Sequence, residues 1–310
     1  MPDLCLIMTA IPQTRAPLFA NLLCMLSMLA WAAGLPAADF LIGKVPPLPL
    51  TAARMTMAAV VLLPMWVLAD GWATLRRAAW VKGIAIGGLT IGLGAVLLVI
   101  GQSMTGSVTV AIISATLPLV GIAIEVALDG RKITLPLIVG LVLALIGGVM
   151  ALGSGAVSVN LGLGALFCFA SVLVFAFGSR LTITAFPDLS PLGRTTITLT
   201  GAAILISCAA LTHAALGAAS PDWAQLGWRE FGALAVFSIG GMAISQVLWI
   251  MSVGQLGIGM ASLHINATPF YVMLILFLFG AAWSWPQALA AAVVGAGVLI
   301  AQGVIFKGRA

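Results

Sequence analysis

The sequence predicts an all-α integral membrane protein of ten transmembrane helices, arranged as two inverted five-helix repeats with both termini in the cytoplasm. First, the 310-residue chain is 62% hydrophobic and 7% charged, with a mean hydropathy of +1.22, values outside the usual range of soluble domains. Second, residues 231–306 contain no Asp, Glu, Lys or Arg, whereas about 20 apolar residues suffice to cross a bilayer. Third, one series of short motifs occurs twice along the chain.

Ten apolar segments are found when each stretch of about 20 hydrophobic residues is closed at a proline, a glycine or a charge. Their ranges are 17–36, 48–69, 83–101, 107–128, 134–153, 160–180, 192–213, 231–253, 258–280 and 287–306. The first segment runs on toward Asp39 without the small-residue site of a cleaved signal sequence, so we expect it to remain as the first helix.

The distribution of basic residues predicts the orientation, because cytoplasmic loops carry an excess of Lys and Arg. If the N-terminus is cytoplasmic, the inner side holds Arg15, Arg76, Arg77, Lys82, Arg131, Lys132, Arg180, Arg194, Lys307 and Arg309. The outer side then holds Lys44, Arg54 and Arg229. The net charge of +5 therefore lies in loops that suit anionic lipid. Clustered basic and aromatic residues of the kind that bind nucleic acid are missing, so we expect no nucleic-acid partner.

The repeated motifs divide the chain into two similar halves. In the first half the series is Gly101-Gln102, Ala115-Thr116-Leu117-Pro118, Pro136 and Gly147-Gly148. In the second half it is Gly254-Gln255, Ala267-Thr268-Pro269, Pro286 and Gly295-Ala296-Gly297. We expect an N-terminal tail at 1–15, a first repeat at 16–153, a second repeat at 160–306 and a C-terminal tail at 307–310. Because five is odd, the second repeat must be inverted, as in many secondary transporters whose substrate site lies near the bilayer midplane.

In the order of these motifs the chain resembles the drug/metabolite transporter superfamily, in particular its ten-helix EamA-type members. The resemblance covers residues from about Ala16 to Phe306, and it includes Trp31, Arg54 after a proline-rich loop, Pro118, Pro269 and the glycine-rich fifth and tenth helices. Length and overall pattern are most similar to the YddG-type exporters of aromatic amino acids and paraquat. The resemblance implies export of small amphipathic metabolites, with amino acids (aromatic and other neutral ones) as the leading class, across a bacterial inner membrane.

The sequence departs from the family pattern after the fourth and ninth helices. Family members often carry a Gly-Glu pair at these places, whereas this chain has Asp129-Gly130-Arg131-Lys132 and Gly280-Ala281-Ala282-Trp283. The role of those glutamates is therefore not transferred to this chain.

A polar surface on the eighth and ninth helices is the predicted path for a substrate. Ser238, Met242, Ser245, Trp249 and Ser252 share one helix face, and polar groups in hydrocarbon must face other helices or a wet cavity. The candidate binding residues are His264, Asn266, Gln246, Trp249, Trp31, Tyr271, Gln102 and Asn21. Interhelical hydrogen bonding is the alternative role for the Ser, Thr and Asn side chains.

Two further features complete the predicted site. The tryptophans Trp31 and Trp249 could stack on an aromatic or cationic substrate. Pro269 should leave the carbonyl of Ile265 without its helical partner, as an acceptor for an ammonium group.

The sequence favours uncoupled efflux by alternating access. Proton coupling inside a membrane requires a titratable group, for which His264 and Glu125 are the candidates. No phosphate-binding Walker loop occurs, so we expect no ATP hydrolysis. The alternatives are a proton-coupled exporter of drug cations such as paraquat, a channel or lipid scramblase, and a membrane-embedded enzyme. We expect no catalytic residues, metal site or cofactor, and a monomer whose partners are a small-molecule substrate and membrane lipids.

Overall fold

The computed structural model describes residues 16–105, 110, 113–152, 162–218, 221–278, 280 and 282–302, and within them all regular structure is helical. The predicted tails at 1–15 and 307–310 lie outside the described residues, as does the end of the predicted tenth segment, residues 303–306.

The helices of the first half follow one another along residues 16–152. They are α2 (Ala16–Ile42), α3 (Pro47–Asp70), the short α4 (Trp72–Arg77), α5 (Trp80–Ile86), the π-helix η1 (Gly87–Gly92), α6 (Leu93–Thr105), α8 (Leu117–Asp129) and α9 (Leu135–Leu152). Since α5, η1 and α6 are continuous, they form one long helix. Helix α2 extends to Ile42 with Pro36 inside it, so the predicted end of the first helix at residue 36 is wrong.

The second half has the same kind of helices along residues 163–301. They are α10 (Leu163–Thr184), α11 (Pro191–Ala215), the 3-10 turn η2 (Trp223–Gln225), α12 (Trp228–Ala235), the π-helix η3 (Val236–Ile244), α13 (Ser245–Leu256), α14 (Ile258–Ser262), the 3-10 helix η4 (Leu263–Ala267), α15 (Thr268–Leu278) and α16 (Trp285–Ala301). The stretch predicted as one ninth helix is therefore interrupted by the 3-10 segment η4.

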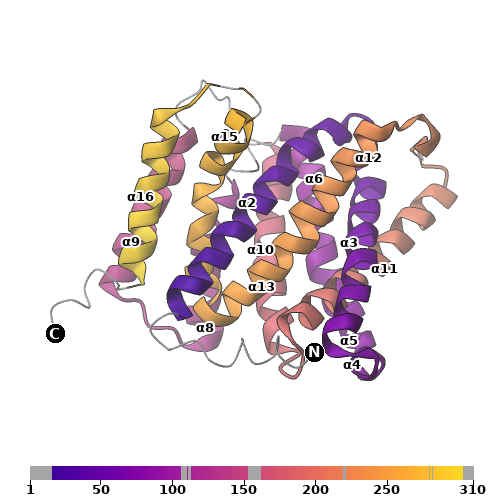
Figure 1. Cartoon of the computed structure of the whole chain (residues 1–310), viewed down its shortest axis with the longest axis horizontal. Helices are drawn as coiled ribbons and strands as arrows, with labels where there is room; N and C mark the ends of the chain where they lie inside the picture. The colour runs from indigo at the N-terminus through magenta and orange to yellow at the C-terminus, as the bar shows by residue number, and fades with distance from the viewer. Residues whose placement is uncertain are drawn as a thin grey trace.

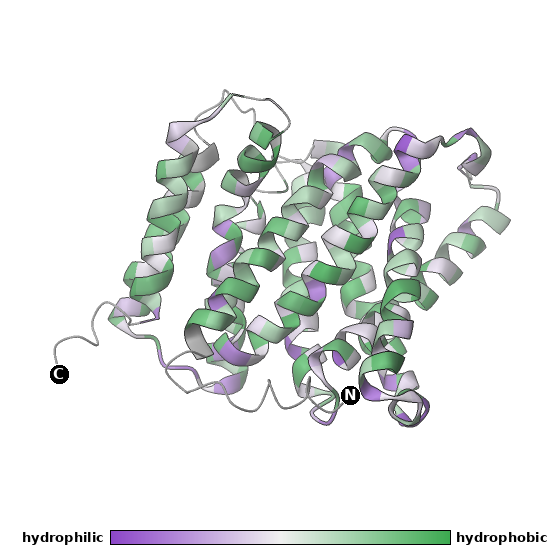
Figure 2. Cartoon of the chain, in the orientation of Figure 1, coloured by the Kyte–Doolittle hydropathy of each residue, from purple (hydrophilic) through white to green (hydrophobic). Residues whose placement is uncertain are grey.

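Six of these helices are long and apolar enough to cross a membrane. They span Leu18–Ile42, Pro47–Asp70, Trp80–Thr105, Leu163–Thr184, Pro191–Ala215 and Trp228–Leu256. Two shorter apolar helices, Leu135–Gly147 and Ala288–Ala301, accompany them. Hydrophobic residues cover most of the length of the helices, and hydrophilic residues gather near their ends and at a few interior positions (Figure 2).

Local sequence explains several helix ends. Ser190 caps α11, because its hydroxyl accepts a hydrogen bond from the Gly193 N–H at 3.0 Å, and Pro191 occupies the first turn, where its missing N–H costs nothing. Helix α8 ends at Gly130, whose φ of 66° is the left-handed conformation that glycine adopts without strain.

Each half contributes one partner to the main helix pairs (Figure 1). The pairs are α9 with α16, α3 with α11, α8 with α14, α6 with α10, and α2 with η3 and α13. In Figure 1, α9 and α16 lie side by side at the left, and α3 and α11 lie at the right. The two halves are therefore interleaved rather than folded as separate bundles.

The two π-helices occur at corresponding places in the two halves. Each interrupts one long helix, and each contains a Gly-Gly pair, Gly87-Gly88 in η1 and Gly240-Gly241 in η3. A Cβ atom at Gly87 would lie 1.9 Å from the carbonyl oxygen of Thr198 on α11, so no larger residue fits there. Such π-segments are frequent at functional sites.

Close packing of α9 on α16 generates a first prediction. A Cβ at Gly297 would lie 2.7 Å from the Gly140 carbonyl oxygen and 2.8 Å from the Ala144 nitrogen, whereas a Cβ at Gly295 meets no atom within 4 Å. Gly297→Ala should therefore push the helices apart and lower the free energy of unfolding by about 1–3 kcal/mol. The matched control Gly295→Ala should be neutral or slightly stabilising, because alanine favours a helix.

The measurement is the thermal unfolding midpoint of both variants in the same detergent. Equal midpoints for the two variants would contradict the close approach of α9 and α16.

Candidate functional site

A cavity of about 90 Å³ lies among helices of both halves, large enough for several water molecules. It is lined by Ser27, Met28, Trp31, Arg54, Ile91, Gly94, Ala95, Leu98, Ser114, Leu117, Ser171, Val172, Phe175, Gly241, Met242, Ser245, Gln246, Trp249 and Ile265. Most of these residues lie near the middle of their helices, for example Phe175 in α10 and Ser245 where η3 joins α13. The cavity thus lies at mid-length of the long apolar helices.

An aromatic wall, formed by Trp31, Phe175 and Trp249, bounds the cavity. The rings of Phe175 and Trp249 lie with their centroids 5.9 Å apart, a distance that is favourable for aromatic pairs. The indole N–H of Trp249 donates to the Ser179 hydroxyl at 3.0 Å. Because Trp249 is 2% exposed, this hydrogen bond satisfies its polar atom and fixes the orientation of the ring.

Two serines of the cavity donate hydrogen bonds to backbone carbonyls of neighbouring helices. Ser27 on α2 donates to the Ser245 carbonyl at 2.7 Å, and Ser171 on α10 donates to the Gly94 carbonyl at 2.7 Å. These hydroxyls join helices, in agreement with the interhelical role weighed above. Gln246, which is also buried, supplies the amide group of the lining.

Arg54 is a cavity residue that the sequence analysis placed among the outer basic residues. Its side chain is 3% exposed and lies on α3. The Nε and Nη2 groups donate to the carbonyls of Phe237 and Gly241 on η3, at 3.3 and 3.0 Å. The guanidinium carbon also lies 3.9 Å from the centroid of the Phe237 ring, a cation–π contact. A lone arginine inside an otherwise uncharged apolar segment was the sequence signal for this position.

Three of the eight predicted binding residues line the cavity, namely Trp31, Gln246 and Trp249. Asn21 lies elsewhere: it donates to the Gln302 side-chain oxygen at 2.8 Å and accepts from the Gln302 amide nitrogen. This amide pair joins α2 to the residue that follows α16.

Gln102 is likewise engaged between helices. Its amide donates to the Asp39 carboxylate at 2.7 Å and approaches the Leu35 carbonyl at 3.4 Å. It therefore connects the end of α6 to the last turns of α2.

The predicted residues of the ninth helix are buried but are not among the residues that line the cavity. The Nδ1 atom of His264 lies 3.1 Å from the Ala261 carbonyl oxygen. Neither amide atom of Asn266 has a hydrogen-bond partner among the described residues. Tyr271 packs against Phe270, with ring centroids 5.9 Å apart.

Ile265 is the residue of η4 that lines the cavity, but its carbonyl is not free. It accepts the backbone N–H of Thr268, because a 3-10 helix pairs each carbonyl with a residue three positions later. The expected open acceptor for an ammonium group is therefore wrong.

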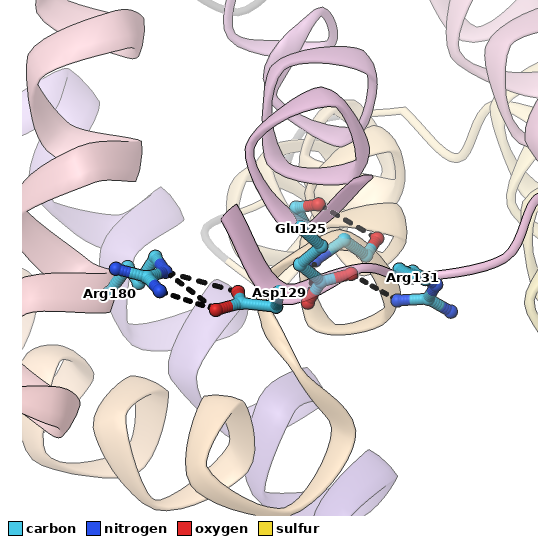
Figure 3. A network of polar contacts seen from close by, with 6 residues as sticks. Glu125, Asp129, Arg131 and Arg180 are labelled. Carbon is cyan, nitrogen blue, oxygen red and sulfur yellow. Dashed lines mark hydrogen bonds and ion pairs between the residues drawn. The ribbon is translucent and has the colours of Figure 1, made fainter. Parts of the chain in front are cut away.

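A polar network lies where α8 ends (Figure 3). The Glu125 carboxylate forms an ion pair with Arg131 and accepts the backbone N–H of Gly259 at 3.0 Å. Gly259 belongs to α14, so this carboxylate connects the two halves. A Cβ at Gly259 would lie 2.8 Å from a Glu125 oxygen, which shows how closely α14 approaches.

Asp129 pairs with Arg180 of α10 in the same network. The Arg180 hydrogen bonds hold the pKa of the Asp129 carboxyl below its usual value. Because the folded-state pKa is lowered, the pair stabilises the fold above the unfolded pKa and this contribution is lost as the pH falls through the folded pKa. Since the pair is partly exposed, solvent screens it and its contribution is small.

Comparisons with known proteins show what the chain is similar to. Residues 18–153 match the EamA-like transporter family. The Bacillus subtilis (strain 168) protein named "Uncharacterized transporter YyaM" is 26% identical over 275 residues, which cover 86% of this chain and 88% of that protein. A protein of known crystal structure superposes with a TM-score of 0.73 at 22% identity, over 94% of this chain and 99% of the other, and thus shares the fold. With the apolar helices, these matches support a multi-pass membrane transporter of small molecules.

The Glu125 network generates a second prediction. Glu125→Ala removes the acceptor of the buried Gly259 N–H and the partner of Arg131, so it should lower the free energy of unfolding by about 1–3 kcal/mol. Glu125→Gln keeps a side-chain oxygen for the N–H and should cost less.

Asp129→Asn is the matched control, one turn further along α8, and should change stability by less than about 1 kcal/mol because its ion pair is exposed. Thermal unfolding in detergent measures all three. Equal effects of Glu125→Ala and Asp129→Asn would show that the contact with α14 does not hold the halves together.

Proposed function

We propose that the protein is a secondary transporter that exports small amphipathic metabolites, above all amino acids, across a bacterial inner membrane by alternating access and without ion coupling. The observation that carries this proposal is the cavity at mid-length of the long helices, which is lined by residues from both halves, including the aromatic side chains of Trp31, Phe175 and Trp249. Secondary transporters bind their substrates at such a place, at the interface of two repeats near the bilayer midplane.

Ten spans in two inverted repeats are the proposed architecture. Ser27 and Trp31 on α2 have counterparts 144 positions later in Ser171 and Phe175 on α10, and all four line the cavity. Three helix pairs combine corresponding elements of the two halves, namely α9 with α16, α3 with α11 and α8 with α14, and η1 and η3 carry their Gly-Gly pairs 153 positions apart. A pseudo-twofold axis through the cavity would generate these correspondences.

The proposed orientation places both termini in the cytoplasm. Residues predicted on one side contact each other: Lys44 pairs with Glu230 on the outer side, while Lys82 donates to the Ala185 carbonyl on the inner side. In Figure 1, α12 begins at the upper edge and α4 and α5 lie at the lower edge. The excess of Lys and Arg at the lower edge favours the cytoplasm there.

Amino acids fit the chemistry of the lining. The aromatic wall suits an apolar or aromatic side chain, and Gln246 and Arg54 offer polar groups for the charged end of the molecule. The resemblance to YddG-type exporters also supports amino acids as the proposed substrate class.

Uncoupled transport is favoured because the described lining contains no Asp, Glu or His. Of the two residues predicted for proton coupling, Glu125 is paired in the network at the end of α8, and His264 is not among the described lining residues. A concentration gradient of the substrate would then be the driving force.

Transport in proteoliposomes tests this function. Purified protein should release preloaded radiolabelled phenylalanine, threonine or methionine down its gradient at a rate that an imposed pH gradient does not change. Trp249→Ala should reduce this rate at least tenfold, since stacking and area in a well-packed aromatic site are worth about 1.4 kcal/mol or more. His264→Ala should leave the rate and its insensitivity to pH gradients unchanged.

Two outcomes would redirect the assignment. Efflux that follows the pH gradient and is lost in His264→Ala or Glu125→Gln would indicate a proton-coupled exporter. Release of drug cations or lipids without release of any amino acid would indicate the alternative classes of exporter or a scramblase.

A further inference from the structure

The geometry points to Arg54 as the residue that binds an anionic group of the substrate, a carboxylate, so that the cavity selects organic anions and zwitterions over cations. This inference rests on the proposed function, in that the cavity is taken as the substrate site. It specifies which end of an amphipathic molecule the site recognises and by which side chain.

The position of Arg54 places its charge where burial costs free energy. It is the eighth residue of the 24-residue helix α3, roughly 10 Å along the helix axis from its start. Long basic side chains near helix ends usually reach to the membrane surface, whereas this one is 3% exposed and turned into the cavity. A charge held at such depth is costly and marks a substrate path more often than a structural one.

Arg54 has no carboxylate partner among the described residues. The ion pairs there join Lys44 to Glu230, Arg131 to Glu125 and Arg180 to Asp129. The carbonyls of Phe237 and Gly241 provide partial negative charge but no full counter-charge. The excess positive charge facing the cavity is what a substrate carboxylate would neutralise.

The guanidinium also retains the means to bind a carboxylate. Arginine has five N–H donors in a planar fork that matches the two oxygens of a carboxylate. The hydrogen bonds to the Phe237 and Gly241 carbonyls use Nε and one Nη2 hydrogen. The contact with the Phe237 ring fixes the plane of the fork, so the remaining donors are already oriented.

The corresponding place in the second half carries no arginine. Helices α3 and α11 both begin with Pro-Leu, at Pro47 and Pro191, and in this register Thr198 corresponds to Arg54. The Thr198 hydroxyl donates to the Arg194 carbonyl at 2.9 Å, and Thr198 does not line the cavity. The positive charge is therefore a property of one side of the cavity rather than of the architecture.

Ligand binding to the full-length protein in detergent tests the inference without requiring transport. The probes share one aromatic ring and differ in charge: 3-phenylpropionate, phenylalanine, phenylalaninamide and 2-phenylethylamine. Quenching of tryptophan fluorescence, to which Trp31 and Trp249 contribute at the cavity, reports affinity. The wild type should bind the two carboxylates at least about tenfold more tightly than the two probes without one, as a charge-assisted bidentate contact implies.

Variants assign the preference to the side chain. Arg54→Gln should bring the affinity ratio of acid to amine close to one, and Arg54→Lys should keep the preference for the acid at weaker affinity, since lysine has the charge without the fork. Arg194→Gln is the matched control, because Arg194 also donates to two carbonyls, those of Phe186 and Pro187, outside the cavity. It should leave the ratio unchanged.

The outcomes separate this inference from the proposed function. Wild-type protein that binds 2-phenylethylamine as tightly as 3-phenylpropionate overturns the inference, and this comparison needs no variant to fold. A ratio preserved in Arg54→Gln overturns it as well. If the protein prefers acids but transports no amino acid, the inference about Arg54 holds and the proposed substrate is wrong. If it transports phenylalanine and phenylalaninamide equally well, amino-acid transport holds and the inference about Arg54 is wrong.

Discussion

Association between apolar helices in a membrane depends on close backbone contact, because burial from lipid supplies little hydrophobic driving force. In this protein the close contacts join the two halves. A Cβ added at Gly121 on α8 would lie 3.2 Å from backbone atoms of Gly259 on α14, and one added at Gly34 on α2 would lie 3.2 Å from the Cα of Gly241 on η3. Where glycines meet, the backbones of the two halves lie close together. Where the bulky side chains of Trp31, Phe175 and Trp249 lie between the halves, the helices are further apart and the cavity is found. The cavity is a consequence of how the halves meet.

The sequence predicted the helical class and the approximate position of most helices, because an apolar run of about 20 residues has few alternatives to a spanning helix. It placed the start of α11 at residue 192, next to Pro191, because the apolar segment was closed at a proline. It did not predict the π-helices or the 3-10 segment η4. These depend on which backbone carbonyls a neighbouring helix can approach, and that is a tertiary property that periodicity does not encode.

The candidate site was predicted in part, for a related reason. Trp249 and Gln246 were identified because the spacing of polar and aromatic residues marks one face of a helix, but Asn21 and Gln102 were equally polar and are held in interhelical pairs. Sequence shows that a polar group must find a partner, not whether the partner is protein or ligand. Arg54 was missed because basic residues were scored for orientation, where a charge near a helix end and a charge inside a helix count alike.

Within the proposed transport cycle, Glu125 and Arg54 have different roles. The carboxylate of Glu125 holds α14 against α8 at the end assigned to the cytoplasm, while Arg54 faces the cavity from α3 and contacts η3. A π-helix has a carbonyl out of register, which lets η3 offer its oxygens to a guanidinium without breaking the helix. A substrate carboxylate on the remaining guanidinium donors would contact a side chain that already joins α3 to η3. Its binding energy would then depend on how α3 and η3 are arranged, and a ligand shifts a conformational equilibrium only through such a difference in affinity.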